Sequence, residues 1–207
     1  MRRWSIGLLL LALLCVPALG FAETYIAAGV GMNAPSFDTT DAGKVALQKD
    51  LFYGGKIGHY FDDRGFNWFG LEIDAYRSTP GIKQQTLPTS TNPRLSGKIP
   101  GADLEVHSLA FNALVRATGY RYKVEPYAGL GIGLNVGNIS SGNFRPEASF
   151  APSFNILAGI RYYMTDSIAP FIEYKYNFAQ FTFNRSNVTA DYRANLFMFG
   201  IAYHFGR

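Results

Sequence analysis

A chain of 207 residues has room for one domain and little room for a second. Without Arg2 and Arg3, which lie in a segment expected to be removed, 17 basic residues stand against 15 acidic ones, an excess too small to favour nucleic acid binding. Only 16% of residues are charged, whereas soluble domains carry about a quarter, so an ordinary soluble domain is disfavoured.

The amino-terminal segment has the order of a secretory signal peptide. Arg2 and Arg3 give it a positive start, an apolar run follows at residues 6–16, and residues 20–22 (Gly-Phe-Ala) offer small side chains at the −3 and −1 positions of a cleavage site. We expect cleavage between Ala22 and Glu23. Residues 1–22 would then be the signal peptide, and residues 23–207 the mature domain.

The single cysteine, Cys15, lies inside this predicted signal peptide. A lipoprotein would use it as the lipidated residue, but the large side chain of Leu14 directly before it disfavours this alternative. The mature chain then has no thiol for a disulfide. Beyond the signal peptide there is no run of 18 apolar residues, so any membrane crossing has to be made by strands.

Apolar and other residues alternate with a period of two along the rest of the chain, which is typical of strands with two unlike faces. Two less regular strands are expected first, at residues 24–33 and 51–62. Six more regular stretches follow, with apolar faces at residues 69–75, 109–115, 128–136, 154–162, 172–178 and 197–205. The sequence therefore predicts eight strands.

Short and long connections alternate between these strands. The short ones lie at residues 62–67, 118–123 and 165–167, and the long ones at 34–50, 78–103, 138–150 and 180–192. This asymmetry is typical of outer-membrane barrels, which have short periplasmic turns and long external loops. We expect an all-β fold, a single eight-stranded antiparallel up-and-down transmembrane β-barrel.

The alternative is a secreted β-sandwich or lipocalin-like barrel with its apolar face turned inward. Gly129, Gly131 and Gly133 share one face of a single strand, where a solvated face would carry Lys, Glu or Thr. Glycine is depleted in strand interiors, but it fits the crowded lumen of an eight-stranded barrel. The opposite face is aliphatic and aromatic, which suits lipid, and a closed barrel leaves no unpaired edge in the hydrocarbon.

The predicted lumen face also carries charged residues, which we expect to pair across the barrel because buried charges need partners. They are Glu72, Asp74, Arg116, Arg161, Glu173 and Lys175. Arg161 is expected opposite Glu173 and Lys175 on the neighbouring strand. The alternative interpretation of these charges is an ion gate in a narrow pore for small solutes or ions.

Residues 126–133 (Pro-Tyr-Ala-Gly-Leu-Gly-Ile-Gly), 158–163 and 173–176 resemble the small outer-membrane β-barrel superfamily. That group includes the barrel domain of outer membrane protein A and the opacity-type surface proteins. The resemblance covers the mature chain and implies a location in the outer membrane of a Gram-negative cell, without a cofactor. It also implies contact with outer-membrane lipid and lipopolysaccharide, with periplasmic chaperones and the barrel-assembly machinery, and with an extracellular ligand of the loops.

The carboxyl-terminal strand resembles the signal that the barrel-assembly machinery reads. Gly200, Tyr203 and Phe205 stand at the positions of its glycine and its two aromatic residues. Two features depart from the pattern. Met198 stands where a polar residue is usual, and the chain continues for two residues past the last aromatic residue.

Some small barrels are lipid A deacylases, which carry a histidine and a serine two residues apart on one strand face. Here His107 and Ser108 are adjacent, so a strand directs them to opposite faces. His59 and His204 have no second ligand at metal spacing. We therefore expect no catalytic residue and no metal site, and a non-enzymatic surface protein whose external loops mediate surface interaction or adhesion. A lipid A-modifying enzyme is the remaining alternative.

Overall fold

The computed structural model describes residues 23–39, 43–61, 66–87, 97–99, 101–117, 123–141, 144–183 and 188–205. The predicted signal peptide, with Ala22, lies outside these residues. No helix in the described part of the chain is long and apolar enough to cross a membrane.

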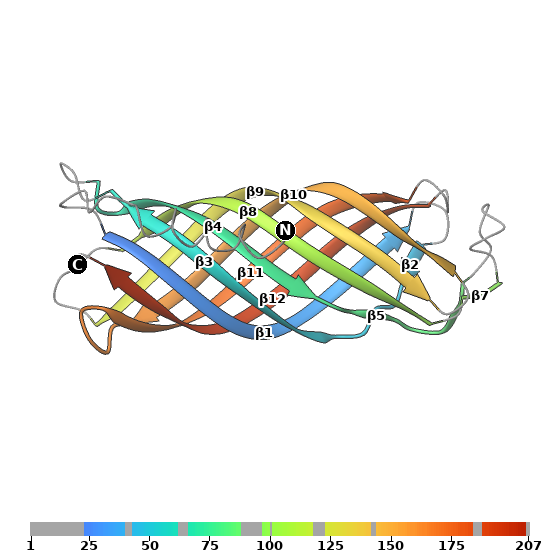
Figure 1. Cartoon of the computed structure of the whole chain (residues 1–207), viewed down its shortest axis with the longest axis horizontal. Helices are drawn as coiled ribbons and strands as arrows, with labels where there is room; N and C mark the ends of the chain where they lie inside the picture. The colour runs from blue at the N-terminus through green and yellow to red at the C-terminus, as the bar shows by residue number, and fades with distance from the viewer. Residues whose placement is uncertain are drawn as a thin grey trace, which may run out of the picture.

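Eight long strands form the wall of a closed barrel (Figure 1). They are β1 (Glu23–Thr39), β3 (Asp50–Tyr60), β4 (Phe69–Ser78), β8 (Ala102–Arg116), β9 (Val124–Ser141), β10 (Phe144–Tyr162), β11 (Ile168–Phe183) and β12 (Val188–Phe205). Each pairs antiparallel with its neighbours, and β12 pairs with β1 to close the barrel. The predicted eight-stranded antiparallel barrel is confirmed.

Four short strands lie near one end of the barrel: β2 (Gly43–Val45), β5 (Gly81–Ile82), β6 (Gln85–Leu87) and β7 (Gly97–Ile99). β2 pairs with β1 beyond the start of β3, and β5 pairs with β8 in the register that β4 already has. β6 and β7 pair with each other. β2 and β5 therefore continue the barrel wall past β3 and β4.

The register around the barrel sets its stagger. Paired residues lead from Tyr25 once round the wall through Gly58, Glu72, Asn112, Gly131, Asn155, Asn177 and Ala194 to Pro35, ten residues further along β1. Strands in such barrels tilt by about 40° from the axis, and the interior is just wide enough for side chains. Residues far apart in the sequence therefore meet inside.

The two ends of the barrel differ. Glu23 and Phe205, the first residue of β1 and the last of β12, lie at one end, which we call the terminal end. β2, β5 and β7 lie at the other, which we call the loop end, on the right of Figure 1. At the terminal end the described turn between β10 and β11 is short, and Met164 and Thr165 donate backbone hydrogen bonds to the carbonyl of Ile168.

An apolar band surrounds the barrel from the terminal end to beyond its middle. Val30 on β1, Ile132 on β9 and Phe199 on β12 are 64%, 70% and 58% exposed. On each strand, the residues that alternate with the exposed ones face inward. About ten residues per strand, rising about 3.3 Å each along strands tilted by about 40°, give a band about 25 Å tall. That height matches the hydrocarbon of an outer membrane, and the predicted outward orientation of the apolar faces is confirmed.

The strands run further toward the loop end than predicted. β1, β10, β11 and β12 all continue into stretches expected to be loops. On β12 the pattern reverses there, because Ala190 and Tyr192 are fully buried inside while Asp191 and Arg193 face outward. Apolar inside and polar outside is the pattern of a soluble barrel. Because the apolar residues face inward there, a pattern of lipid-facing alternation does not predict these strand ends.

Gly31 shows how closely β1 and β12 approach each other. A Cβ added at Gly31 would lie 2.0 Å from the backbone oxygen of Phe197 and 2.6 Å from the ring of Phe52. We predict that Gly31→Ala lowers the free energy of unfolding by about 3 kcal/mol, measured as a lower urea midpoint. Gly55→Ala is the matched control, since its added Cβ meets nothing closer than 3.5 Å. Equal midpoints for the two variants would contradict this packing.

Candidate functional site

Inward side chains fill the lumen in four successive layers. From the terminal end, the terminal cluster comprises Glu23, Arg116, Glu125, Arg161 and His204, and the central cluster comprises Lys56, Glu72, Asp74, Glu173 and Lys175. The asparagine layer comprises Asn33, Asn135, Asn155 and Asn177, and the apolar layer comprises Phe37, Leu104, Val106, Phe181, Phe183 and Tyr192. All of these residues are buried.

The terminal cluster is a chain of ion pairs across five strands, β1, β8, β9, β10 and β12. Arg116 Nη1 donates to Glu23 Oε2 at 2.5 Å and to Glu125 Oε2 at 3.3 Å. Arg161 Nη1 donates to Glu125 Oε1 at 3.3 Å, and the His204 Nδ1 atom lies 2.5 Å from Glu23 Oε1. Glu23 and Glu125 therefore each bridge two cationic or imidazole groups.

Three tyrosine rings surround the Arg161 guanidinium. Its carbon lies 4.4 Å from the ring centroid of Tyr25 and 4.2 Å from that of Tyr127, and Nη1 donates to the Tyr60 hydroxyl at 2.6 Å. Aromatic faces attract cations, more strongly where water is excluded. The rings thus replace much of the hydration that this buried charge has lost.

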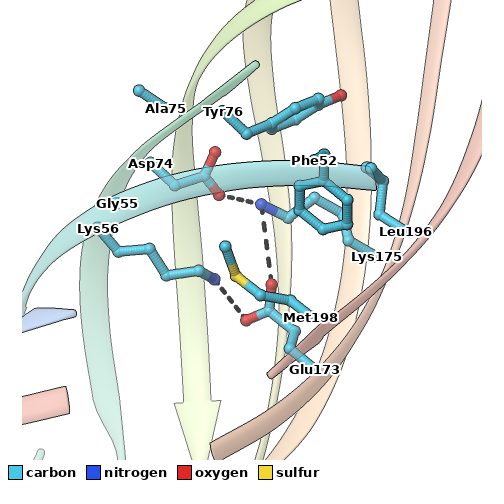
Figure 2. A pocket seen from close by; sticks show the side chains of 10 residues that line it. All are labelled: Phe52, Gly55, Lys56, Asp74, Ala75, Tyr76, Glu173, Lys175, Leu196 and Met198. Carbon is cyan, nitrogen blue, oxygen red and sulfur yellow. Dashed lines mark hydrogen bonds and ion pairs between the residues drawn. The ribbon is translucent and has the colours of Figure 1, made fainter. Parts of the chain in front are cut away.

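The central cluster holds two ammonium groups among three carboxylates. Lys56 Nζ lies 3.2 Å from Glu72 Oε1 and 2.5 Å from Glu173 Oε2. Lys175 Nζ pairs with Asp74 and lies 3.8 Å from Glu173 Oε1. Figure 2 shows Glu173 between the two lysines, which makes it the carboxylate that both share.

Neutral donors complete the central cluster. The Tyr25 hydroxyl donates to Glu72 at 2.6 Å, and the Tyr127 hydroxyl donates to Glu173 at 2.9 Å. Asn112 Nδ2 donates to both Glu72 and Asp74, at 3.1 and 2.7 Å. These bonds satisfy much of the excess carboxylate charge, as buried charges require.

A small cavity adjoins this cluster and is lined by Lys56, Asp74, Glu173 and Lys175, with apolar side chains from β12. Its volume of about 10 Å³ leaves room for about one water molecule. Asp74 Oδ1 is buried without a hydrogen-bond partner among the described residues. The space is too small for a substrate.

The six charged residues predicted for the lumen all face inward, but they lie in two clusters. The central cluster holds four of them, Glu72, Asp74, Glu173 and Lys175, and the terminal cluster holds Arg116 and Arg161. The expected position of Arg161 opposite Glu173 is wrong, since Arg161 faces Phe171 and Glu173 faces Gly159. A register displaced by two residues places Arg161 nearer the terminal end.

Sequence reasoning missed three charged members of these clusters. Lys56 lies in an irregular glycine-rich strand, and Glu23 and Glu125 stand at or next to the first residue of their strands. Only the alternation along each strand could have indicated that these side chains face inward. Lys56, for example, shares a face with Phe52 and Tyr60, which are also buried. Pairing between strands was needed to reveal their partners.

The apolar layer closes the lumen above the polar ones. Phe181 is fully buried, its ring centroid lies 5.7 Å from that of Tyr192 in an edge-to-face contact, and it stacks on Phe183 at 6.0 Å. Leu104 and Val106 from β8 are also fully buried. Apart from the Tyr192 hydroxyl, which accepts a hydrogen bond from Asn33 at 3.2 Å, the side chains named in this layer offer no polar group to an ion or a solute.

Histidine and serine side chains lie apart. His107 faces outward and its Nε2 atom lies 3.0 Å from Glu105 Oε1, while Ser108 is buried in the lumen, as their adjacency predicts. His59 Nδ1 and Thr24 Oγ1 are 2.9 Å apart. Among the residues that the structure describes, no group of three His, Cys, Asp or Glu side chains is placed to hold a metal ion.

The three residues of the predicted assembly signal lie on both faces of β12. Gly200 faces the lumen, where an added Cβ would lie 2.4 Å from the Ala28 oxygen. Tyr203 and Phe205 face outward with ring centroids 4.9 Å apart. Their role in assembly stays a prediction, as does cleavage before Glu23.

A closed eight-stranded barrel with a lipid-facing band and a filled lumen defines a small integral barrel protein of the outer membrane. The chain belongs to the outer membrane protein beta-barrel domain family, whose model matches residues 6–205. It is a protein of the cell outer membrane. By the convention of such barrels, the terminal end is periplasmic and the loop end is external.

Several solved structures share the fold at low sequence identity. Neisserial surface protein A (NspA) is 17% identical, with a TM-score of 0.57 over 89% of this chain and 96% of that one. OprG from Pseudomonas aeruginosa is 15% identical, with a TM-score of 0.54 over 91% and 98%. Ail of Yersinia pestis, in complex with the heparin analogue sucrose octasulfate, is 18% identical, with a TM-score of 0.52 over 89% and 99%. No curated protein sequence matches the chain.

Proposed function

We propose that this protein is a non-enzymatic surface protein of the outer membrane. The barrel is a closed scaffold, and its external wall and connecting loops contact other molecules at the cell surface. One observation carries the proposal: the apolar layer fills the lumen at a level where the wall still continues outward. The packed lumen makes this wall rigid, and binding loops are commonly positioned by rigid scaffolds of this kind.

On β1, β11 and β12 the outward face of this wall is polar, as a surface in water should be. Arg193 Nη1 lies 3.4 Å from Asp38 Oδ2, and Nη2 lies 3.6 Å from Asp191 Oδ2. Gln180 Nε2 donates to Asp191 Oδ1 at 2.9 Å. These contacts cross β1, β12 and β11, so a binding surface here would be ordered before a partner arrives, which lowers the entropy cost of binding.

Two structural relatives support a role at the surface. One carries the name surface protein A, and the other is an attachment invasion locus protein seen with a heparin analogue. The filled lumen argues against transport, and the separation of His107 from Ser108 argues against a serine hydrolase built from that pair. Adhesion is the role that these points favour.

The test compares cells with and without the gene for adherence to immobilised host glycans and matrix proteins. A variant with Gln180, Asp191 and Arg193 all changed to Ala probes the external wall, and Phe199→Ala in the lipid-facing band is its control. We expect adherence to fall without the gene and in the triple variant only. Equal adherence of all strains would refute the role, and lipid A altered by the gene would favour an enzyme instead.

A narrow pore is the second candidate, because two of the four lumen layers are charged. Conduction would require the apolar layer to open. Single-channel recording in planar bilayers separates the two candidates, since the scaffold reading predicts no steady conductance from the unaltered protein.

A further inference from the structure

The barrel wall has a seam between β10 and β11 at the loop end (Figure 1). The ladder between these strands ends where Ser153 pairs with Ala179, although β10 starts further out, at Phe144, and β11 continues to Phe183. Over this stretch each strand stays paired on its other side, β10 with β9 and β11 with β12. We call the two stretches that lack a common ladder, residues 147–152 and 180–183, the seam.

A proline explains where this ladder stops. The N–H and C=O groups of Thr182 both face β10, because both bond Ser149 there. Alternate residues of an antiparallel strand direct their backbone groups to the same side, so those of Gln180 face β10 as well. The next residue in register, Pro152, has no N–H to offer the Gln180 oxygen. Proline is confined to the edges and bulges of sheets, so the ladder ends at this point.

The Ser149 side chain links the two edges of the seam. Its hydroxyl donates to the Thr182 oxygen at 2.9 Å and accepts from the Thr182 amide at 3.1 Å. In an unbroken register Phe150 would stand opposite Thr182, and its backbone groups face the seam by the same alternation. The hydroxyl therefore takes the place of a backbone partner, and Phe150 has no ladder partner on the described part of β11. Unpaired strand edges of this kind are templates for another chain.

Side chains beside the seam lie in two distinct environments. Ala151 and Phe181 are fully buried and face the lumen. Phe150 is 69% exposed and Gln180 is also exposed, and both face outward. Gln180 stands opposite Asp191 and donates to it, so the seam lies in the external wall, beyond the apolar band. A strand placed here needs apolar side chains toward the lumen and polar ones toward water.

Widening the seam leaves the rest of the barrel intact. Within the membrane, the ladder between β10 and β11 runs without a break from Ser153 to Arg161. The aromatic contacts of Phe181 with Phe183 and Tyr192 lie within β11 and β12, so these contacts do not cross the seam. The external wall can therefore open beyond the last pair of this ladder while the part in the membrane stays closed.

We propose that the seam binds an extended polypeptide segment as an added strand, which rests on the surface role proposed above and names its partner. The segment would displace the Ser149 hydroxyl from Thr182 and bond both edges through its backbone. In strand addition, main-chain hydrogen bonds supply affinity and alternate side chains supply specificity. The apolar residues of the segment would pack on Ala151 and Phe181. The ligand class is an exposed stretch of alternating apolar and polar residues in another protein.

The test uses the folded mature protein in detergent micelles and a fluorescent peptide with the sequence Lys-Lys-Thr-Val-Thr-Val-Thr-Val-Lys-Lys. Fluorescence anisotropy measures the binding of this peptide. A second peptide carries an N-methyl group on each valine, which removes the backbone N–H donors of the valines and keeps every side chain. The comparison of the two peptides shows whether the backbone is what the protein recognises.

Two pairs of variants direct this test to the seam. Pro152→Thr restores a backbone N–H at the end of the ladder, and Pro126→Thr is its matched control, because Pro126 is an exposed wall proline near the periplasmic end. Ser149→Ala removes the hydroxyl link, and Ser153→Ala is its control, since the buried Ser153 hydroxyl has no hydrogen-bond partner among the described residues. Heat-dependent gel mobility verifies that each variant is folded.

We expect Pro152→Thr to bind the peptide about tenfold more weakly than the unaltered protein, because a ladder that continues closes the seam. Ser149→Ala should bind the peptide more tightly, and both controls should match the unaltered protein. The N-methylated peptide should bind to none of them. Equal binding of the two peptides, or equal binding by Pro152→Thr and Pro126→Thr, would overturn the proposal.

Two further measurements separate this proposal from its neighbours. Analytical ultracentrifugation without peptide tests a second copy as the occupant, and a dimer that Pro152→Thr abolishes, together with absence of peptide binding, would also overturn the proposal. The adherence assay described above tests the surface role itself. Adherence without peptide binding would refute the seam proposal alone, whereas peptide binding without adherence would support it and refute the surface role.

Discussion

Glu173→Ala is expected to lower the free energy of unfolding by about 3–5 kcal/mol, the usual cost of breaking a buried ion pair from one side. Glu173 is the carboxylate that Lys56 and Lys175 share, and all three side chains are buried. Without it, two ammonium groups keep only Glu72 and Asp74 as partners. The urea midpoint of the folded barrel in lipid vesicles measures the loss.

Two comparisons make this prediction specific to the buried cluster. Glu105→Ala removes the carboxylate of an exposed pair and should cost less than about 1 kcal/mol. The double variant Lys56→Met with Glu173→Leu replaces a buried pair by apolar groups and should recover part of the loss. An unchanged midpoint in Glu173→Ala would mean that the central cluster does not hold the barrel together.

The double variant Phe181→Ala with Leu104→Ala is expected to open the lumen. Each side chain is fully buried in the apolar layer, and truncating a buried phenylalanine typically costs about 3–5 kcal/mol. Apolar constrictions block ions by excluding water, so removing this one should permit single-channel conductance in planar bilayers, while the unaltered protein stays closed.

Phe199→Ala is the matched control for conductance, because it truncates an aromatic residue of the lipid-facing band. Glu173→Ala tests the competing view that ion pairs close the lumen. We expect both to remain silent. Conductance in Glu173→Ala, or a steady conductance in the unaltered protein, would contradict closure by the apolar layer.

Alternation along single strands was enough to predict eight strands and their faces, because lipid outside and a narrow lumen inside demand opposite side chains at successive positions. Leu109, Phe111 and Val115 face outward as predicted, and Asn112 and Arg116 face inward. The strand ends outside the membrane could not be found in this way, because water replaces lipid there and the apolar face turns inward.

It was easier to predict which residues face the lumen than to predict which of them contact one another. Lys56 and Glu173 are 117 positions apart in the sequence, and their contact depends on the ten-residue stagger of the whole barrel. No pattern within one strand contains that stagger. Arg161 illustrates the result, since its face was predicted correctly while its partner, Glu125, was not.

The reversal of polarity along β12 also determines how deep the protein sits in the bilayer. Sinking by one pair of residues would carry Arg193 and Asp191 toward the acyl tails, and a charged side chain on a barrel's lipid face costs up to about 2–4 kcal/mol at the midplane. Rising by the same step would lift Phe197 into water. The sequence of β12 therefore sets how deep the barrel sits in the bilayer, independent of any partner.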